Sequence, residues 1–312
     1  MKTMPPEGEL RQPPISCDPV SMGTWLKAIR VHQWAKNLLI FVPLLAAHDL
    51  SITTKWREGA VGFICFSLGA SAIYLINDVV DRDVDSQHPT KKFRAIASGQ
   101  IKPRIAILIS IFLLLAALLT GTTLNRDFEL TLVFYLVLTF AYSFYLKNIA
   151  IVDVIALTLF YVVRVIAGAN ATHIQLSFWL LGFSIFIFLS LGFAKRYSEL
   201  ANAIAAGEET VSKRGYRNAD APIILILGVS AGYAALVILA LYLNTDLVQG
   251  LYARPQYIWA LVPVIAFWVN WMWLNAYRGE MDEDPVLYAI KEKASLITVG
   301  VAALVLIASS IH

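Results

Sequence analysis

Charged side chains are scarce in this sequence: Asp, Glu, Lys and Arg make up 15% of 312 residues, whereas an ordinary soluble domain has about 25%. Hydrophobic residues make up 58%, and the mean hydropathy is +0.65. One soluble core of this size cannot bury so much apolar surface. The two cysteines, Cys17 and Cys65, are too few for a disulfide framework or a metal-binding quartet. Disordered chains, disulfide scaffolds and cytosolic nucleic-acid-binding proteins are thereby excluded, and an integral membrane protein remains.

The N-terminal segment lacks an apolar run. Residues 1–20 are polar and rich in proline, without the hydrophobic region of a cleavable signal peptide. We therefore expect a flexible cytoplasmic tail over 1–22, followed by a single transmembrane domain over 23–312.

Long apolar stretches fill the rest of the chain. A membrane-spanning helix needs about 20 mainly apolar residues, and nine stretches qualify, of which the first is short and contains Pro43. An interfacial helix over 23–36 is expected to lead into it. The predicted fold is all-α, a polytopic membrane bundle of about nine transmembrane helices. The predicted spans are 37–52, 58–77, 103–124, 129–146, 149–170, 176–194, 221–243, 256–274 and 294–311.

Basic residues are distributed unevenly between the two sides of these spans. Twenty of the 25 Lys and Arg residues fall on the side of the N-terminus, four on the other side, and Arg164 inside a span. Because Lys and Arg concentrate in cytoplasmic loops, we expect a cytoplasmic N-terminus and an external C-terminus. The two longest connections, 78–102 and 195–220, then face the cytoplasm, and so does a site built on them.

An acidic cluster follows the second predicted span, where residues 77–85 read NDVVDRDVD. If the helix continues, Asp78, Asp81 and Asp85 share one face at i, i+3 and i+7. Stacked like charges repel unless a cation lies among them, and Mg²⁺ typically uses one or two carboxylates together with substrate phosphates. A solvated helix end is the alternative. The basic stretch HPTKKFR at 88–94 follows directly, so acids and bases together indicate a diphosphate site.

These motifs carry a family resemblance. The NDxxDxxxD pattern at 77–85 resembles the signature of the UbiA superfamily of intramembrane prenyltransferases, and HPTKKFR resembles its polyprenyl-phosphate phosphoribosyltransferase branch, typified by decaprenyl-phosphate phosphoribosyltransferase. Ala95 stands where that branch would have proline, which affects no metal ligand. Three further segments are similar to that branch: RVHQWAKN at 30–37, YVVRVIAG at 161–168 and AKRYSEL at 194–200.

The resemblance implies an Mg²⁺-dependent glycosyltransferase that moves 5-phosphoribose from phosphoribosyl pyrophosphate to a polyprenyl phosphate lipid and releases pyrophosphate. The catalytic, metal-binding residues it implies are Asp78, Asp81 and Asp85. The substrate-binding residues we predict are Gln33, Lys36, Asn37, Asn77, Lys91, Arg94, Arg164, Lys195, Arg196, Tyr197 and Glu199.

The segment after the sixth span distinguishes this branch from enzymes that alkylate aromatic rings, which usually carry a second aspartate pair there. Here Lys195, Arg196, Tyr197 and Glu199 take that place, and the i, i+4 spacing allows Lys195 and Glu199 to share a helix face and pair. One side of the site would thus hold Mg²⁺ and a diphosphate, and the other a phosphate without metal. An ordinary basic anchor on the cytoplasmic side, with an ion pair within the helix, is the alternative.

Other charged residues are interpreted more simply. Arg164 lies inside a span, where an ionisable side chain usually faces a polar cavity, and Asp153 lies about three turns before it on the same helix face. Binding of a backbone carbonyl is the alternative for Arg164. The acids at 280–284 have no metal-ligand register, and we interpret them as a solvated loop.

Two other functions stay open at this stage. An aromatic prenyltransferase that uses a prenyl diphosphate, in a quinone or haem pathway, would share the fold and the first motif. A secondary transporter would place its charges near the bilayer midplane, which this sequence hardly does. We expect the membrane and the two phosphate substrates as partners, and no nucleic acid. Both a monomer and a homo-oligomer are compatible with the sequence.

Overall fold

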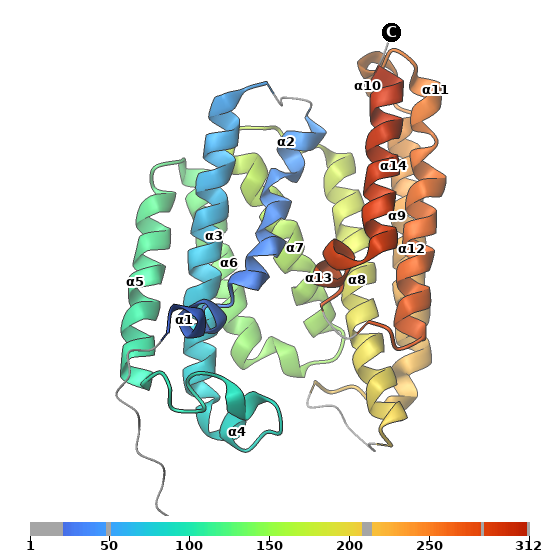
Figure 1. Ribbon diagram of the computed structural model, residues 1–312. Coiled ribbons are helices and arrows are strands. Elements are labelled where there is room, and N and C mark those ends of the chain that lie inside the picture. The colour runs from blue at the N-terminus through green and yellow to red at the C-terminus, as the bar shows by residue number, and fades with distance from the viewer. Residues whose placement is uncertain (1–20, 48–50, 208–213, 282–283, 311–312) are drawn as a thin grey trace, which may run out of the picture.

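The computed structural model describes residues 21–47, 51–207, 214–281 and 284–310. Nearly all of the predicted tail, 1–22, lies outside the described residues. Over the described ranges the regular elements are helices, which confirms the predicted all-α bundle (Figure 1).

Eight helices of the described residues are long and apolar enough to cross a membrane. Eight of the nine predicted spans are thus found, with ends that differ by a few residues. The largest difference is at the end of α8, which continues eleven residues beyond its predicted end at 194. The AKRYSEL segment therefore lies on this helix. The eight are α3 (Thr53–Val80), α5 (Pro103–Gly121), α6 (Arg126–Phe144), α7 (Val152–Ala171), α8 (Phe178–Ala205), α9 (Ala221–Leu243), α12 (Leu261–Tyr277) with α11 (Pro255–Ile258) before it, and α14 (Lys293–Ser310).

The predicted first span, 37–52, has a different structure. After α1 (Met22–Ala28), the chain forms the 3₁₀ helix η1 (Val31–Phe41) and the short α2 (Val42–Ala46), and neither is among the eight spans. Pro43 lies in the first turn of α2, where its missing N–H costs nothing, and it ends the preceding hydrogen-bond pattern. The segment is therefore an irregular rod packed against α3 and α7.

One glycine sets how closely η1 approaches α7. A Cβ atom at Gly168 would lie 1.9 Å from the carbonyl oxygen of Ile40, a distance no real side chain tolerates. The two backbones therefore touch at this point, which fixes the depth of η1 relative to α7.

The first and last parts of the chain meet in the middle of the molecule. In Figure 1 the blue-to-green elements form one half and the yellow-to-red elements the other, with η1 and α13 (Pro285–Lys291) between them, and these two short helices are in contact. The remaining short elements join helix ends: α4 (Arg82–Ser86), η2 (Lys91–Phe93), η3 (Leu146–Asn148), η4 (Asn218–Asp220) and α10 (Asp246–Leu251).

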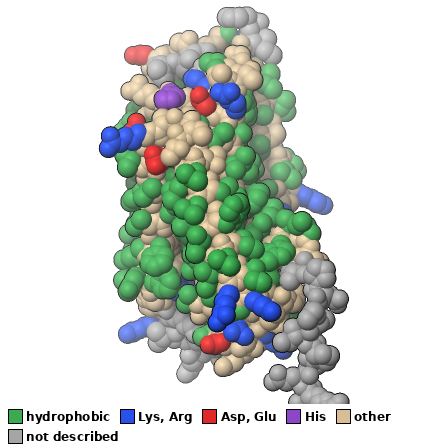
Figure 2. Space-filling view, turned by 90° about the vertical axis from the view of Figure 1, so that its left-hand side faces the viewer, with side chains coloured by type: hydrophobic (Ala, Val, Ile, Leu, Met, Phe, Trp, Pro, Cys, Tyr) green, Lys and Arg blue, Asp and Glu red, His purple; other side chains and the backbone are tan. Residues whose placement is uncertain are grey.

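Apolar side chains cover the outside of the bundle as well as filling it. Large hydrophobic residues such as Leu108, Phe112 and Leu119 of α5 are more than half exposed. On the face that Figure 2 shows, hydrophobic side chains form a broad band, and Lys, Arg, Asp and Glu lie mainly toward the two ends. Such a surface suits the hydrocarbon core of a bilayer, so the chain is a multi-pass membrane protein.

Candidate active site

The acidic motif bends instead of continuing as one helix. Helix α3 ends at Val80, Asp81 caps it, and α4 starts at Arg82. The expectation that Asp78, Asp81 and Asp85 share one face depended on a helix that continues through them, and α3 does not continue. Helical backbone hydrogen bonds still cross the break at Asp81, and Asp78 and Asp85 both contact Arg94.

Arg94 holds the two aspartates together. Its Nη1 atom lies 3.2 Å from Oδ1 of Asp78 and 2.7 Å from Oδ2 of Asp85. The two aspartate side chains are only 7% and 3% exposed, so each carboxylate depends on this cation for compensation. Two carboxylates thus converge on a single positively charged atom.

Arg30 approaches Asp78 from the other side. Its Nη2 atom lies 2.6 Å from Oδ1 of Asp78, and its guanidinium lies 4.6 Å from the centre of the Tyr74 ring. Arg30 has a left-handed backbone (φ 54°), which is uncommon for a residue with a side chain. The ion pair and the ring contact compensate for that conformation and hold the guanidinium at the acidic motif.

Two neighbouring pockets open at this point. We call the first, of about 430 Å³, the aspartate pocket, because Asp78 and Arg94 line it together with Lys27. We call the second, of about 580 Å³, the lysine pocket; six cationic residues and a single carboxylate are among its described lining residues. The charged residues of the lysine pocket are Arg30, Lys36, Arg164, Lys195, Arg214, Lys291 and Asp284. Both pockets share Arg30, His32 and Gln33, so ligands in the two could touch.

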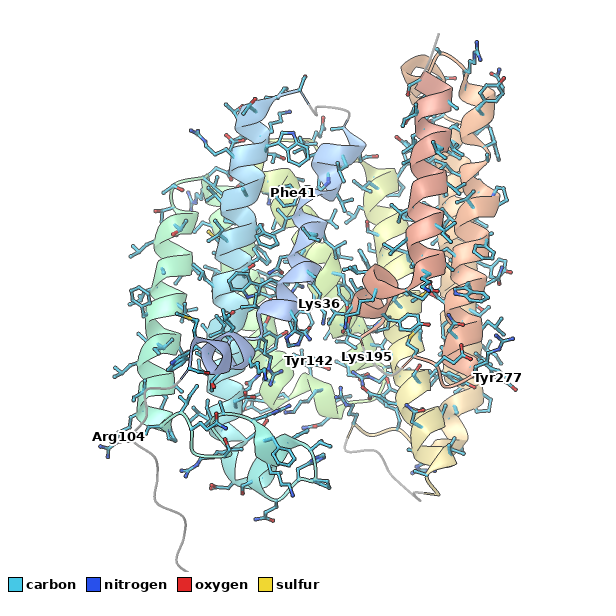
Figure 3. All side chains as sticks on the ribbon, viewed as in Figure 1. Lys36, Phe41, Arg104, Tyr142, Lys195 and Tyr277 are labelled. Atoms are coloured by element: carbon cyan, nitrogen blue, oxygen red, sulfur yellow. The ribbon has the colours of Figure 1, made fainter. Side chains whose placement is uncertain are left out.

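Asp284 lies at the centre of the lysine pocket's charge. Its Oδ2 atom accepts hydrogen bonds from Nζ of Lys36 at 2.8 Å and Nζ of Lys195 at 3.2 Å, and its Oδ1 atom accepts one from the Tyr161 hydroxyl at 2.8 Å. Figure 3 shows Lys36 and Lys195 facing the space between the two halves of the bundle. Two predictions are corrected here. Asp284 is buried rather than solvated, and Lys195 pairs with Asp284 rather than with Glu199.

The buried charges alter each other's protonation. Burial alone would raise the pKa of Asp284, but the ammonium groups of Lys195 and Lys36 together hold it well below its usual range. Burial lowers the pKa of Lys36 to about 8, and the negative charge of Asp284 opposes a larger fall. Lys36 is therefore a cation at neutral pH that loses its proton a little above it.

Arg164 combines both interpretations offered for it. Its guanidinium donates to Oδ1 of Asn37 at 2.7 Å, to the Tyr135 hydroxyl at 3.0 Å and to the Phe160 carbonyl. It also lines the lysine pocket. Asn37 in turn donates to the Ser67 hydroxyl at 2.9 Å, and so acts by holding Arg164 rather than by lining either pocket.

The second predicted motif mostly faces away from the pockets. Arg196 is 1% exposed and pairs with Asp153 and with Glu199. The ring of Tyr197 stacks on that of Tyr277 at a centroid distance of 6.3 Å and lies 6.2 Å from the ring of Trp273. Asp153, expected to share a cavity with Arg164, instead accepts a hydrogen bond from Tyr216 at 2.6 Å and lines neither pocket. Of the four residues predicted in this motif, Lys195 lines the lysine pocket.

Some of the other residues predicted to bind substrate line a pocket, and others do not. Gln33 lines both pockets, and Asn77 lines the lysine pocket while donating to the Ser143 hydroxyl at 3.0 Å. Lys91 is exposed on η2 and lines neither pocket. Sequence reasoning missed Asp284 and Tyr161, and it quoted Arg30 in a motif without assigning it to the site.

The acidic motif provides oxygen donors of the kind Mg²⁺ prefers. In the part of the chain that the structure describes, no three His, Cys, Asp or Glu side chains are grouped closely enough to form a metal site. Asp78 and Asp85 nevertheless converge on one cationic nitrogen of Arg94. The guanidinium of Arg94 fills the position between the two carboxylates, so assignment of a metal to this motif stays a prediction.

Comparison with curated proteins finds relatives of two kinds. The chain is 36% identical to the uncharacterized protein y4nM of Sinorhizobium fredii over 87% of its own length and 53% of the relative, so it spans about half of that protein. It is 33% identical to the nodulation protein NoeC of Azorhizobium caulinodans over 88% of its own length and 90% of the relative. It is 39% identical to decaprenyl-phosphate phosphoribosyltransferase of Mycobacterium tuberculosis over 58% of its length and 62% of the relative.

The fold also matches a solved structure. A UbiA homologue from Archaeoglobus fulgidus bound to GPP and Mg²⁺ superposes with a TM-score of 0.64 at 18% identity, over 90% of this chain and 99% of that one. At this identity the match shows the fold. The model of the UbiA prenyltransferase family matches residues 38–306, most of the chain. The resemblance of the sequence motifs is thus confirmed, and the chain belongs to the UbiA prenyltransferase family.

Proposed function

We propose that this membrane transferase moves 5-phosphoribose from phosphoribosyl pyrophosphate to a polyprenyl phosphate lipid, with release of pyrophosphate. The aspartate pocket would hold the donor's pyrophosphate, and the lysine pocket the phosphate of the acceptor. The observation that carries this proposal is the charge of the lysine pocket, where six cationic residues accompany a single carboxylate among the described lining residues.

The alternative substrate pair fits this charge less well. An aromatic prenyltransferase binds one diphosphate and a ring acceptor, which does not require a second strongly cationic pocket. Both substrates of a phosphoribosyl transfer to a polyprenyl phosphate carry phosphate, and Arg and Lys bind phosphate through charge-assisted hydrogen bonds. The similarity to decaprenyl-phosphate phosphoribosyltransferases supports the same choice.

The proposed reaction needs positioning more than acid–base chemistry. A phosphate oxygen of the acceptor forms a bond to C1 of the ribose, the bond from C1 to pyrophosphate breaks, and pyrophosphate leaves with that electron pair. By analogy with glycosyl transfer, the transition state has oxocarbenium character. Because the acceptor phosphate is already anionic at neutral pH, no side chain has to remove a proton. Lys36, Lys195 and Arg164 would orient the acceptor.

The donor side would combine arginines with a metal. Arg30 and Arg94 are the cations beside Asp78, and they would bind oxygens of the pyrophosphate. Asp78, Asp81 and Asp85 would hold Mg²⁺, which when bound supplies positive charge for the leaving pyrophosphate. Gln33, shared by both pockets, would lie between donor and acceptor.

The proposal includes the orientation of the chain. The Lys and Arg distribution supports a cytoplasmic N-terminus and an external C-terminus. Both pockets would then open to the cytoplasm, where a soluble, highly charged donor could reach them.

Product analysis tests the proposal. The purified chain in lipid nanodiscs is incubated with Mg²⁺, labelled phosphoribosyl pyrophosphate and a polyprenyl phosphate, and lipids are identified by mass spectrometry. We expect a polyprenyl phosphoribose that carries the label, and none after addition of EDTA.

A parallel reaction distinguishes the alternative. The same preparation receives a prenyl diphosphate and 4-hydroxybenzoate in place of the phosphoribosyl substrates. A prenylated ring together with no phosphoribosyl lipid would overturn the proposal in favour of aromatic prenyl transfer.

A further inference from the structure

A buried carboxylate between two phosphate-binding lysines needs an explanation, because it offsets the positive charge that attracts substrate. Asp284 precedes α13 and caps it, with Oδ1 accepting the backbone N–H of Val286 at 3.2 Å. With Lys36, Lys195 and Tyr161, this makes four donors from four elements: η1, α7, α8 and α13. A carboxylate held by four donors has a fixed position.

We propose that Asp284 is a positioning residue that holds the ammonium groups of Lys36 and Lys195 side by side and charged, so that together they form one binding point for a substrate phosphate. This inference rests on the proposed function, in which that phosphate belongs to the polyprenyl acceptor.

The geometry makes such a support necessary. The side chains of Lys36 and Lys195 are 13% and 24% exposed, so solvent screens their mutual repulsion poorly. Both Nζ atoms bind the same oxygen, Oδ2 of Asp284. The carboxylate therefore keeps the two cations close together, where two unpaired lysines would move apart or lose a proton.

The groups around Lys36 act in opposite directions. Asp284 favours its charged form, whereas burial, Lys195 of α8 and Arg164 of α7 disfavour it. Tyr161 of α7 faces the same carboxylate, and Arg30 and Lys291 line the same pocket. Asp284 is the carboxylate among the described lining residues. Its loss would leave Lys36 surrounded by positive charge and would lower the pKa of Lys36 further.

The simpler interpretation is that Asp284 only fastens α13 to the bundle. That role needs the hydrogen bonds but not the negative charge. Asp284→Asn separates the two, because an asparagine can still accept from Tyr161 and from the Val286 N–H, and caps helices as well as aspartate does.

Competitive labelling of Lys36 with acetic anhydride tests the inference without any substrate. The extent of acetylation of the Lys36 peptide is followed by mass spectrometry over a pH series in the full chain, which gives the pH midpoint for loss of its proton. We expect the midpoint to fall by about one to three pH units in Asp284→Asn. Asp127→Asn, on exposed residue 127 in the first turn of α6, is the matched control and should leave the midpoint unchanged.

A second variant covers the case in which Asp284→Asn does not fold. Lys195→Met removes the competing cation, so the Lys36 midpoint should rise. An unchanged midpoint in a folded Asp284→Asn protein, or an unchanged or lower midpoint in Lys195→Met, would overturn the inference.

The pH dependence of kcat/KM provides a second measurement, which would not change if Asp284 only attached α13 to the bundle. Since kcat/KM reports ionisation of the free enzyme, its alkaline limb for polyprenyl phosphate should shift to lower pH in Asp284→Asn and converge with the original chain at acidic pH. In a background that carries both Lys36→Arg and Lys195→Arg, where neither cation can deprotonate, Asp284→Asn should cause no such shift, and a persisting shift would overturn the inference. If the chain transfers no phosphoribose at all, the proposed function fails, and the labelling experiment still decides the role of Asp284.

Discussion

Two clusters of acids and arginines lie near the same end of the bundle but differ in what surrounds them. The open cluster consists of Arg30, Asp78, Asp85 and Arg94, and the sealed cluster of Asp153, Arg196 and Tyr216. Asp78 and the arginines of the open cluster line a pocket, and Arg30 and Arg94 are 25% and 31% exposed. Asp153 and Arg196 are 0% and 1% exposed and line neither pocket.

The difference teaches how charge is used in this molecule. In the sealed cluster every charge is compensated by a fixed partner from a neighbouring element, and a ligand has no access. In the open cluster the arginines retain exposed surface that a phosphate could reach. The types of residue are alike in both, so access to a cavity, rather than the presence of charge, separates binding from structural residues.

Arg196→Met should give the largest effect and act on stability. It leaves the carboxylate of Asp153 buried without its cation, and loss of one partner of a buried pair costs about 3–5 kcal/mol. Unfolding in detergent should show this loss, while the KM values of the protein that remains folded stay unchanged. Replacing Asp153 by Leu in the same chain should restore part of the stability. A fully stable Arg196→Met protein with raised KM values would place Arg196 in the substrate site instead.

Asp78→Asn should act on turnover and leave the fold intact. We expect kcat/KM for phosphoribosyl pyrophosphate to fall at least about 100-fold, about 2.7 kcal/mol at 1.36 kcal/mol per tenfold change, because a metal ligand and the partner of two arginines are lost together. The unfolding transition should move little, because the arginines can turn to solvent. Asp83→Asn, on an exposed residue of the same motif, is the control. An equal loss in Asp83→Asn would mean that the general charge of the motif, and not the Asp78 site, is responsible.

Tyr216→Phe should give the smallest effect, and in the sealed cluster alone. The Tyr216 hydroxyl donates to Asp153 and accepts from the backbone N–H of Ile151 at 2.7 Å. Burial and the adjacent carboxylate raise the pKa of Tyr216, so the hydroxyl stays protonated as a donor. Its removal should cost about 1 kcal/mol of unfolding free energy without changing the product or its rate. A change in substrate affinity would show that the sealed cluster is coupled to the pockets.

The sequence predicts the membrane bundle and the acidic motif well, since both are local features. Hydropathy finds eight spans, and the spacing of Asp78 and Asp85 points to one site. The cation that these two aspartates share could not be predicted from their spacing, because Arg94 reaches them from a later loop. The prediction of the first span, 37–52, was wrong because a short apolar segment that contains a proline need not form one α-helix.

The lysine pocket was only partly predictable, because its contacts join distant parts of the chain. Asp284 lies 248 residues after Lys36 and 89 after Lys195, inside a polar stretch that looks solvated. The different surroundings of Lys195 and Arg196 follow from the extension of α8, which the span prediction ended at 194. Successive residues of a helix point about 100° apart, so Lys195 lines the lysine pocket while Arg196 pairs with Asp153.

The absence of a side chain at Gly168 affects Arg164, which lies one turn earlier on α7. Because Ile40 rests directly on Gly168, Asn37 one turn back on η1 meets Arg164 one turn back on α7. A methyl group added at residue 168 would push η1 away from α7 and break the hydrogen bond between Asn37 and the guanidinium of Arg164. The position of the buried Arg164 guanidinium thus depends on the absence of a Cβ atom at Gly168, a residue that lines neither pocket.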